Sequence, residues 1–223
     1  MSTTTSTRAQ QCDAATSVTR SLLGYGVIAG PLYVVVSVAQ ALTRDGFDVT
    51  RHAWSVLANG SLGWIQIVNF VVAGAMTIAL AVGLRRALPA QRWAPRLVGG
   101  YGASLVAAGV FRADPALGFP AGTPADARDV SWHGLVHFAV GAVGFLCLIV
   151  ACLLLARGLA ADGQRGWAWF TRITGVFFLA AFVGIASGAD SAATILGFVV
   201  AVILVSVWMS AFSVHLYRAV DMR

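Results

Sequence analysis

The sequence contains neither lysine nor glutamate: all 15 basic residues are arginine and all 9 acidic residues are aspartate. Charged residues make up only 11% of the 223 residues, whereas soluble domains carry about 25%. This scarcity of charge excludes an ordinary water-exposed surface. The hydrophobic share of 58% and the mean hydropathy of +0.80 indicate lipid as the surrounding solvent.

Several functional signatures are also missing. Three cysteines do not make a disulfide framework, and Cys147 and Cys152 fall inside an apolar run. There is no phosphate loop, dinucleotide fingerprint, haem attachment motif or nucleophile elbow. The net charge of +6 comes from arginines in short loops beside apolar segments rather than from a basic patch. This pattern is typical of membrane proteins, so we expect no nucleic-acid partner.

Six apolar segments dominate the chain. A helix rises about 1.5 Å per residue, so a bilayer core of about 30 Å requires about 20 apolar residues. The segments lack period-two alternation, which favours helices over a barrel. We predict an all-α, polytopic membrane protein with a single six-transmembrane-helix bundle over residues 21–223, its helices at about 22–42, 61–84, 96–112, 132–156, 168–188 and 193–216.

The arginines predict the orientation. Residues 1–20, the second and fourth connections and the C-terminus carry 11 arginines and 3 aspartates, whereas the other connections carry 4 arginines and 6 aspartates. Basic residues near helix ends favour the cytoplasmic side. Both termini are therefore predicted to be cytoplasmic. Residues 1–20 are rich in Ser and Thr and lack an apolar core, so we expect a disordered cytoplasmic tail rather than a signal peptide.

Two polar connections lie on the opposite, outer side. In the first, Thr50 is a plausible N-cap for a short helix over 51–59, and Gly60 is a suitable end. Such a helix would put His52, Ser55 and Asn59 on one face. Gln66 and Asn69 then enter the second helix on a common side.

In the other outer connection, Asp114 precedes Pro115 and marks a turn. His133 and His137 begin the fourth helix four residues apart, and Gly141 and Gly144 leave room beneath them. The predicted topology brings these ionisable groups to one leaflet. We therefore expect a polar pocket there that includes His52, Asp114, His133, His137 and Asp190.

Three interpretations of this cluster are open. The polar groups can form a structural hydrogen-bond network that holds the loops. They can form a ligand site, for which the candidates are Arg51, His52, Asn69, Arg112, Asp114, His133 and His137. They can also form a metal or catalytic site, with His133 and His137 as two ligands of zinc and His52, Ser55 and Asp114 as catalytic candidates. The residues between His133 and His137 include no Glu, which excludes the zinc-protease motif.

The strings RHAWSVLANGSLGWIQIVNF, FRADPALGFP and SWHGLVHF resemble the bacterial membrane family DUF998 over approximately residues 22–217. An Arg-x-x-x-Ser-x-Leu segment is matched by Arg51, Ser55 and Leu57, and a Phe-x-x-Asp-Pro step by Phe111, Asp114 and Pro115. A Ser-x-x-His opening of the fourth helix is matched less closely, by Ser131 with Trp132 before His133. The resemblance implies a six-helix bundle in the bacterial plasma membrane and brings no catalytic residues with it.

These observations lead to three functional hypotheses. The first is a multi-pass membrane protein whose outer-leaflet pocket binds a small or lipidic ligand. The second is a metal-dependent membrane hydrolase, distantly similar to transmembrane hydrolases of the alkaline ceramidase and progestin-receptor type, which have seven helices and another motif order. The third is a non-catalytic scaffold or partner-binding subunit. Membrane lipid is the expected partner, and an arginine at the outer mouth can hold an anionic headgroup.

Overall fold

The computed structural model describes residues 3–188 and 191–220, with side chains from residue 14 onward. Within this part of the chain all regular elements are helical, which confirms the predicted all-α class. There are six α-helices and one short 3₁₀ helix, with these bounds: α1 Thr3–Thr43, η1 Trp54–Ala58, α2 Gly63–Ala87, α3 Ala94–Val110, α4 Trp132–Ala161, α5 Arg165–Ala186 and α6 Ala192–Val220.

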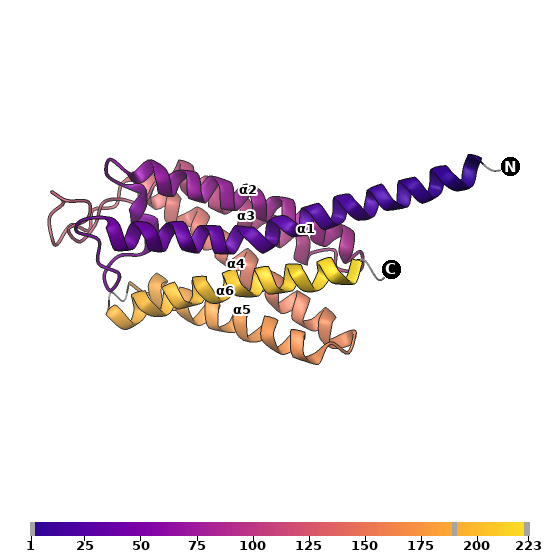
Figure 1. The fold of residues 1–223 in the computed structure, drawn as a ribbon. Helices are drawn as coiled ribbons and strands as arrows, with labels where there is room; N and C mark the ends of the chain where they lie inside the picture. Colours follow the sequence, from indigo (N-terminus) through magenta and orange to yellow (C-terminus); the bar gives the residue numbers. More distant parts are fainter. Residues whose placement is uncertain (1–2, 189–190, 221–223) are drawn as a thin grey trace.

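The helices form a closed ring in chain order. Each helix packs against the next, and α6 returns to pack against α1. Figure 1 shows α1 beginning and α6 ending at the same end of the bundle, here called the terminal end. The opposite end, here called the η1 end, carries η1 and the long connection between α3 and α4. Large buried side chains fill the ring, among them Trp208, Phe178, Phe212, Leu148 and Leu155.

Five helices are long and apolar enough to cross a membrane: α2, α4, α5, α6 and the part of α1 from Ala14. The chain is therefore a multi-pass membrane protein by length and composition. The remaining helix, α3, has 17 residues, or about 25 Å. Its backbone contacts α2 closely, because a Cβ added to Gly74 would meet the Gly102 carbonyl oxygen at 2.6 Å. A sixth span through α3 stays a prediction.

The start of α1 differs from the sequence analysis. The helix begins at Thr3, so the described part of the segment predicted to be disordered is helical. Residues 3–20 contain neither proline nor glycine, and nothing in that stretch interrupts the i→i+4 hydrogen bonds.

Pro31 lies inside α1, where it cannot donate to the carbonyl of Val27. The Ser210 hydroxyl of α6 donates to that carbonyl instead, at 2.9 Å. The two helices approach closely at this level, since a Cβ added to Gly30 would lie 2.7 Å from the Ser206 carbonyl oxygen. The close approach at Gly30 and the Ser210 hydrogen bond to the carbonyl that Pro31 leaves open therefore hold α1 against α6. This contact closes the ring.

The short helix predicted over 51–59 is wrong in extent and in cap. The observed 3₁₀ helix begins at Trp54, and its N-cap Ala53 has no side-chain cap. Thr50 instead donates through its backbone N–H and its hydroxyl to the Asp48 carboxylate, at 2.8 and 2.6 Å. Local side-chain bonding competes with helix formation here, so the chain turns before Ala53.

Candidate functional site

The connections over 44–62 and 111–131 cover the η1 end and are tied together by side-chain to backbone hydrogen bonds. The Arg44 guanidinium donates to the carbonyls of Leu57 and Asn59 and lies 4.8 Å from the centre of the Phe119 ring. The Asn59 amide donates to the Ala113 carbonyl at 2.9 Å. Both connections therefore form one cap over the helices.

His52 holds this cap from the inside. Its Nδ1 accepts from the Asp48 backbone N–H at 2.9 Å, so its Nε2–H donates to the Leu117 carbonyl at 3.2 Å. The side chain is 2% exposed and lies against the rings of Phe47 and Phe119. Burial lowers the pKa of His52, because a charged imidazole loses its hydration there. Both ring nitrogens are engaged, so His52 has no free nitrogen for a metal or a substrate.

The Asp114 carboxylate binds the N-cap residue of helix α4. One carboxylate oxygen accepts from the Ser131 backbone N–H at 2.7 Å, and the other accepts from the Ser131 hydroxyl at 2.6 Å. Ser131 is the N-cap of α4, and its oxygen accepts from the Gly134 N–H at 3.2 Å. The negative charge therefore lies at the positive end of the helix dipole, a stabilising arrangement.

The two histidines of α4 have different environments. His133 is exposed and lies beside the Trp132 ring, with 3.5 Å between ring centroids. His137 is one turn deeper and 7% exposed, and its Nδ1–H donates to the Phe111 carbonyl at the end of α3, at 2.8 Å. No group of three or more metal-ligating side chains occurs among the described residues. The zinc hypothesis therefore lacks a third ligand in this part of the chain.

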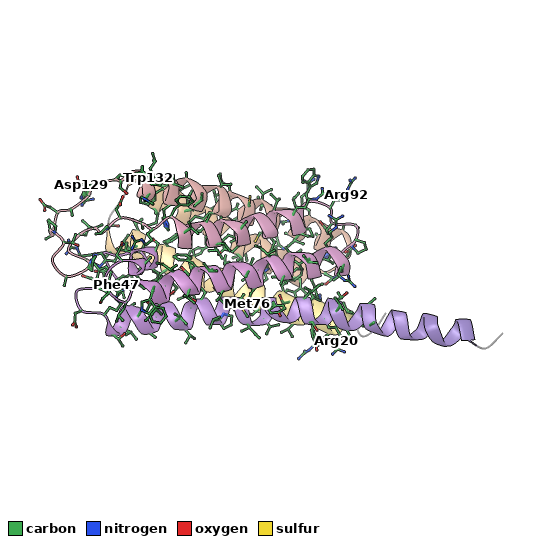
Figure 2. All side chains as sticks on the ribbon, turned by 90° about the horizontal axis from the view of Figure 1, so that it is seen from above. Arg20, Phe47, Met76, Arg92, Asp129 and Trp132 are labelled. Carbon is green, nitrogen blue, oxygen red and sulfur yellow. The ribbon has the colours of Figure 1, made fainter. Side chains whose placement is uncertain are left out.

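The charged ligand candidates lie elsewhere. Arg51 and Arg112 are exposed, and Arg51 donates to the Ala125 carbonyl at 3.3 Å. Asp190, which was expected to join the cluster, lies outside the described residues. Figure 2 shows Asp129, Trp132 and Phe47 at the η1 end and Arg92 at the terminal end.

A buried polar network joins α1 to α2. The side-chain amide oxygen of Gln66 accepts hydrogen bonds from Gln40 at 2.8 Å and from Ser37 and Asn69 at 3.3 Å. The Asn69 amide also donates to the Tyr33 backbone carbonyl at 3.1 Å. Asn69, a ligand candidate by sequence, therefore takes part in helix packing. The side-chain oxygens of Gln40 and Asn69 are buried without a partner among the described residues.

A cavity of about 400 Å³ lies inside the ring toward the η1 end. Residues of α1 to α6 and of the η1 region line it. Its walls are mostly apolar, and its aromatic residues are Tyr33, Phe70, Tyr101, Phe138, Phe145, Phe182 and Phe198. The other polar side chains at the wall are Ser55, Ser104 and His137. Of the predicted candidates, the cavity brings together only Ser55 and His137.

Two of the residues that line this cavity, one on α4 and one on α5, are exposed at the surface of the helical ring. Deeper in the bundle the two helices touch, because a Cβ added to Gly175 would lie 2.8 Å from the Cys152 Cβ. Toward the η1 end, the Phe145 ring lies between the two helices, 5.5 Å from the centre of the Phe182 ring. Figure 1 shows α4 running obliquely to α5 and α6. The lining residue Phe138 is 56% exposed, and Ala186 is also exposed.

Comparison with protein families decides the identity of the chain. The model of the family described as "Protein of unknown function (DUF998)" matches residues 27–215. The chain belongs to the DUF998 family. A search of curated proteins and a search of solved structures each gave no match. The resemblance drawn from the three sequence strings is thereby confirmed.

The sequence signals of this DUF998 member reveal its cavity only in part. His137 and Gly141 line it, as the expected space beneath the histidines suggested, but the Ser104 side chain occupies the space expected at Gly144. The lining residues Phe145, Phe182 and Phe198 have no distinguishing pattern, because an aromatic residue in an apolar helix fits a lipid-facing, a buried or a cavity position equally well. Gln40 offered a signal that was missed, since an amide within an apolar run requires a buried partner.

Proposed function

We propose that this DUF998 protein binds a small apolar or amphiphilic molecule in the cavity inside its helical ring. The cavity carries the proposal: its volume of about 400 Å³ is within the usual range for ligand sites. Its composition is also typical of such sites, with mostly aromatic and aliphatic walls and a few polar groups.

The surrounding bilayer is the source of ligand that best fits this geometry. The lining residues Phe138 on α4 and Ala186 on α5 are both exposed at the surface of the ring. An apolar molecule that enters between these helices does not cross water. We further propose that the protein lies in a bacterial plasma membrane with both termini in the cytoplasm, which puts the cavity in the outer half of the bilayer.

An apolar aryl diazirine, added to the protein in lipid nanodiscs, tests whether the cavity takes up a ligand. After illumination, we expect covalent labelling of Tyr101, Leu105 or Ala108, which are buried on α3 and line the cavity. Peptide mass spectrometry locates the label. Lipid-facing positions such as Leu135 are also labelled and serve as an internal reference.

Two glycine variants form a matched pair for this experiment. A Cβ added to Gly141 or to Gly197 meets no atom within 4 Å, but only Gly141 lines the cavity. Gly141→Leu should reduce labelling on α3 at least about fivefold by occupying cavity volume, and Gly197→Leu should leave it unchanged. Absence of α3 labelling in the wild-type protein, or equal labelling in both variants, would contradict the proposal.

The alternative hypotheses have less support. A zinc hydrolase requires three protein ligands at one point, and no such group occurs among the described residues. His52 and Asp114 are both engaged in hydrogen bonds of the cap and of the α4 start. A scaffold function predicts a cavity that remains unlabelled, so the same experiment distinguishes it.

A further inference from the structure

One polar group at the wall of the cavity, His137, offers a hydrogen-bond acceptor to a ligand. His137 lies at the wall, and its Nδ1 is 2.8 Å from the Phe111 carbonyl oxygen. A carbonyl oxygen only accepts hydrogen bonds, so the proton of the neutral imidazole is on Nδ1 and Nε2 has the free lone pair. The Ala108 backbone carbonyl on α3 also acts on the imidazole, and the hydrogen bond that fixes the tautomer is the one from Nδ1 to Phe111.

The described lining of the cavity offers no partner for a charged ligand. Among residues 3–188 and 191–220, those that line it include no arginine and no aspartate. A carboxylate or phosphate placed there would lose its hydration without a counter-ion, which is costly. A second proton on His137 would be similarly costly, because the side chain is 7% exposed and has no carboxylate bonded to it. An uncharged polar group is the chemistry that fits.

Besides the Tyr33 and Tyr101 hydroxyls, two serine hydroxyls lie at the wall, and they agree with this assignment. The Ser104 hydroxyl donates to the Tyr101 carbonyl at 2.7 Å, so its proton is already in use. The Ser55 hydroxyl lines the η1 end of the cavity and makes no hydrogen bond to another described residue, so it is available to donate to a ligand oxygen. The aromatic wall extends inward from His137 to Phe145, eight residues further along α4, or about 12 Å.

From these contacts we propose that the ligand class is an uncharged long-chain alcohol, whose hydroxyl donates to His137 Nε2 and whose chain lies along the aromatic wall. The proposal rests on the proposed function, and it narrows the ligand from any apolar molecule to one with a neutral hydrogen-bond donor at one end. Fatty-acid anions and phospholipid headgroups are excluded from this position.

Competition against the aryl diazirine in nanodiscs tests the donor directly. Heptadecanol and its isomer hexadecyl methyl ether have the same atoms, but only the alcohol donates a hydrogen bond. We expect the alcohol to suppress labelling of α3 at a mole fraction about tenfold lower than the ether. Heptadecanoate, at a pH where it is ionised, should compete less well than either.

Substitution of His137 provides the second arm. His137→Phe keeps a ring but removes the acceptor, so the alcohol and the ether should compete equally while α3 is still labelled. His133→Phe, one turn away and exposed, should keep the advantage of the alcohol.

The outcomes separate the two proposals. If α3 is labelled but the two isomers compete equally in the wild-type protein, or heptadecanoate competes best, the alcohol assignment is wrong and the proposed function stands. If no cavity residue is labelled in the wild-type protein, the proposed function itself fails.

Discussion

At the residue scale, the polar groups of the η1 end divide between architecture and cavity. His52, Asp114 and Arg44 each use their hydrogen-bonding atoms to hold the cap or to start α4. His137 uses one nitrogen in the same way and keeps the other available. The two histidines, His52 and His137, therefore have different roles. The difference comes from the backbone groups to which each ring is hydrogen-bonded.

His52 predicts a pH dependence of the cap. Its folded-state pKa is lowered by burial, so the unfolded chain binds a proton at a higher pH than the folded chain does. The stabilisation is complete above about pH 6.5 and decreases as the pH falls below that value. Amide hydrogen exchange over residues 44–60 should therefore accelerate between about pH 7 and pH 5, after correction for the intrinsic exchange rate.

A His52→Gln variant is the control for this prediction. It should exchange faster than the wild type at neutral pH and show a shallower pH dependence of protection. Asp48 and Arg51 are the charged groups that act on His52. The pKa of Asp48 is itself lowered, mainly by its bonds from Thr50, so it contributes only below about pH 4. Equal slopes in the wild type and the variant would contradict the assignment.

At the scale of elements, the contacts between helices combine close backbone approach with single hydrogen bonds. The α2–α3 contact depends on Gly74 and Gly102, whose added Cβ atoms would each meet the other's carbonyl oxygen within 3 Å. The α1–α2 contact depends on the network centred on Gln66. In lipid such contacts replace the hydrophobic effect as the force that selects helix neighbours.

Pro31 and Ser210 should be energetically coupled. Ser210→Ala removes the donor to the Val27 carbonyl that Pro31 leaves without its helical partner, which should cost about 0.5–1 kcal/mol in free energy of unfolding. In a Pro31→Ala background, residue 31 donates to that carbonyl, so the same serine substitution should cost close to nothing. Reversible unfolding in detergent measures this double-mutant cycle, and additive costs would show that the Ser210 bond does not depend on the proline.

At the scale of the whole molecule, the charge asymmetry coincides with the two ends of the ring. Figure 2 places Arg20 and Arg92 toward the terminal end, and Asp129 at the η1 end. The excess of arginine at the terminal end favours the cytoplasm for that side.

This orientation is testable with single cysteines after replacement of the three native ones. Asp129→Cys should react with a membrane-impermeant maleimide in intact cells, because the proposed orientation puts the connection between α3 and α4 outside. Arg92→Cys should react only after the cells are opened. The reverse pattern would invert the orientation, and labelling of both in intact cells would show that α3, the helix between the two positions, does not cross the membrane.

The sequence by itself determined the all-α class of the fold and the approximate positions of its helical segments. Apolar runs of sufficient length give helices because lipid supplies no partners for the backbone, and this requirement is local. The helices found for the last three runs, for example, begin within three residues of their predicted starts. The same local reasoning identified His137 and the space near Gly141 as features of one wall.

Only the tertiary structure decided which polar groups act together. His52, Ser55 and Asn59 were expected on one helical face, but the chain enters η1 at Trp54, and the three side chains then meet Leu117, the cavity and Ala113 separately. The Phe111 and Leu117 carbonyls that engage the histidines are backbone groups, which every sequence contains. Their positions depend on how α3 ends and how its loop folds, so no pattern of side chains along the chain encodes the cavity directly.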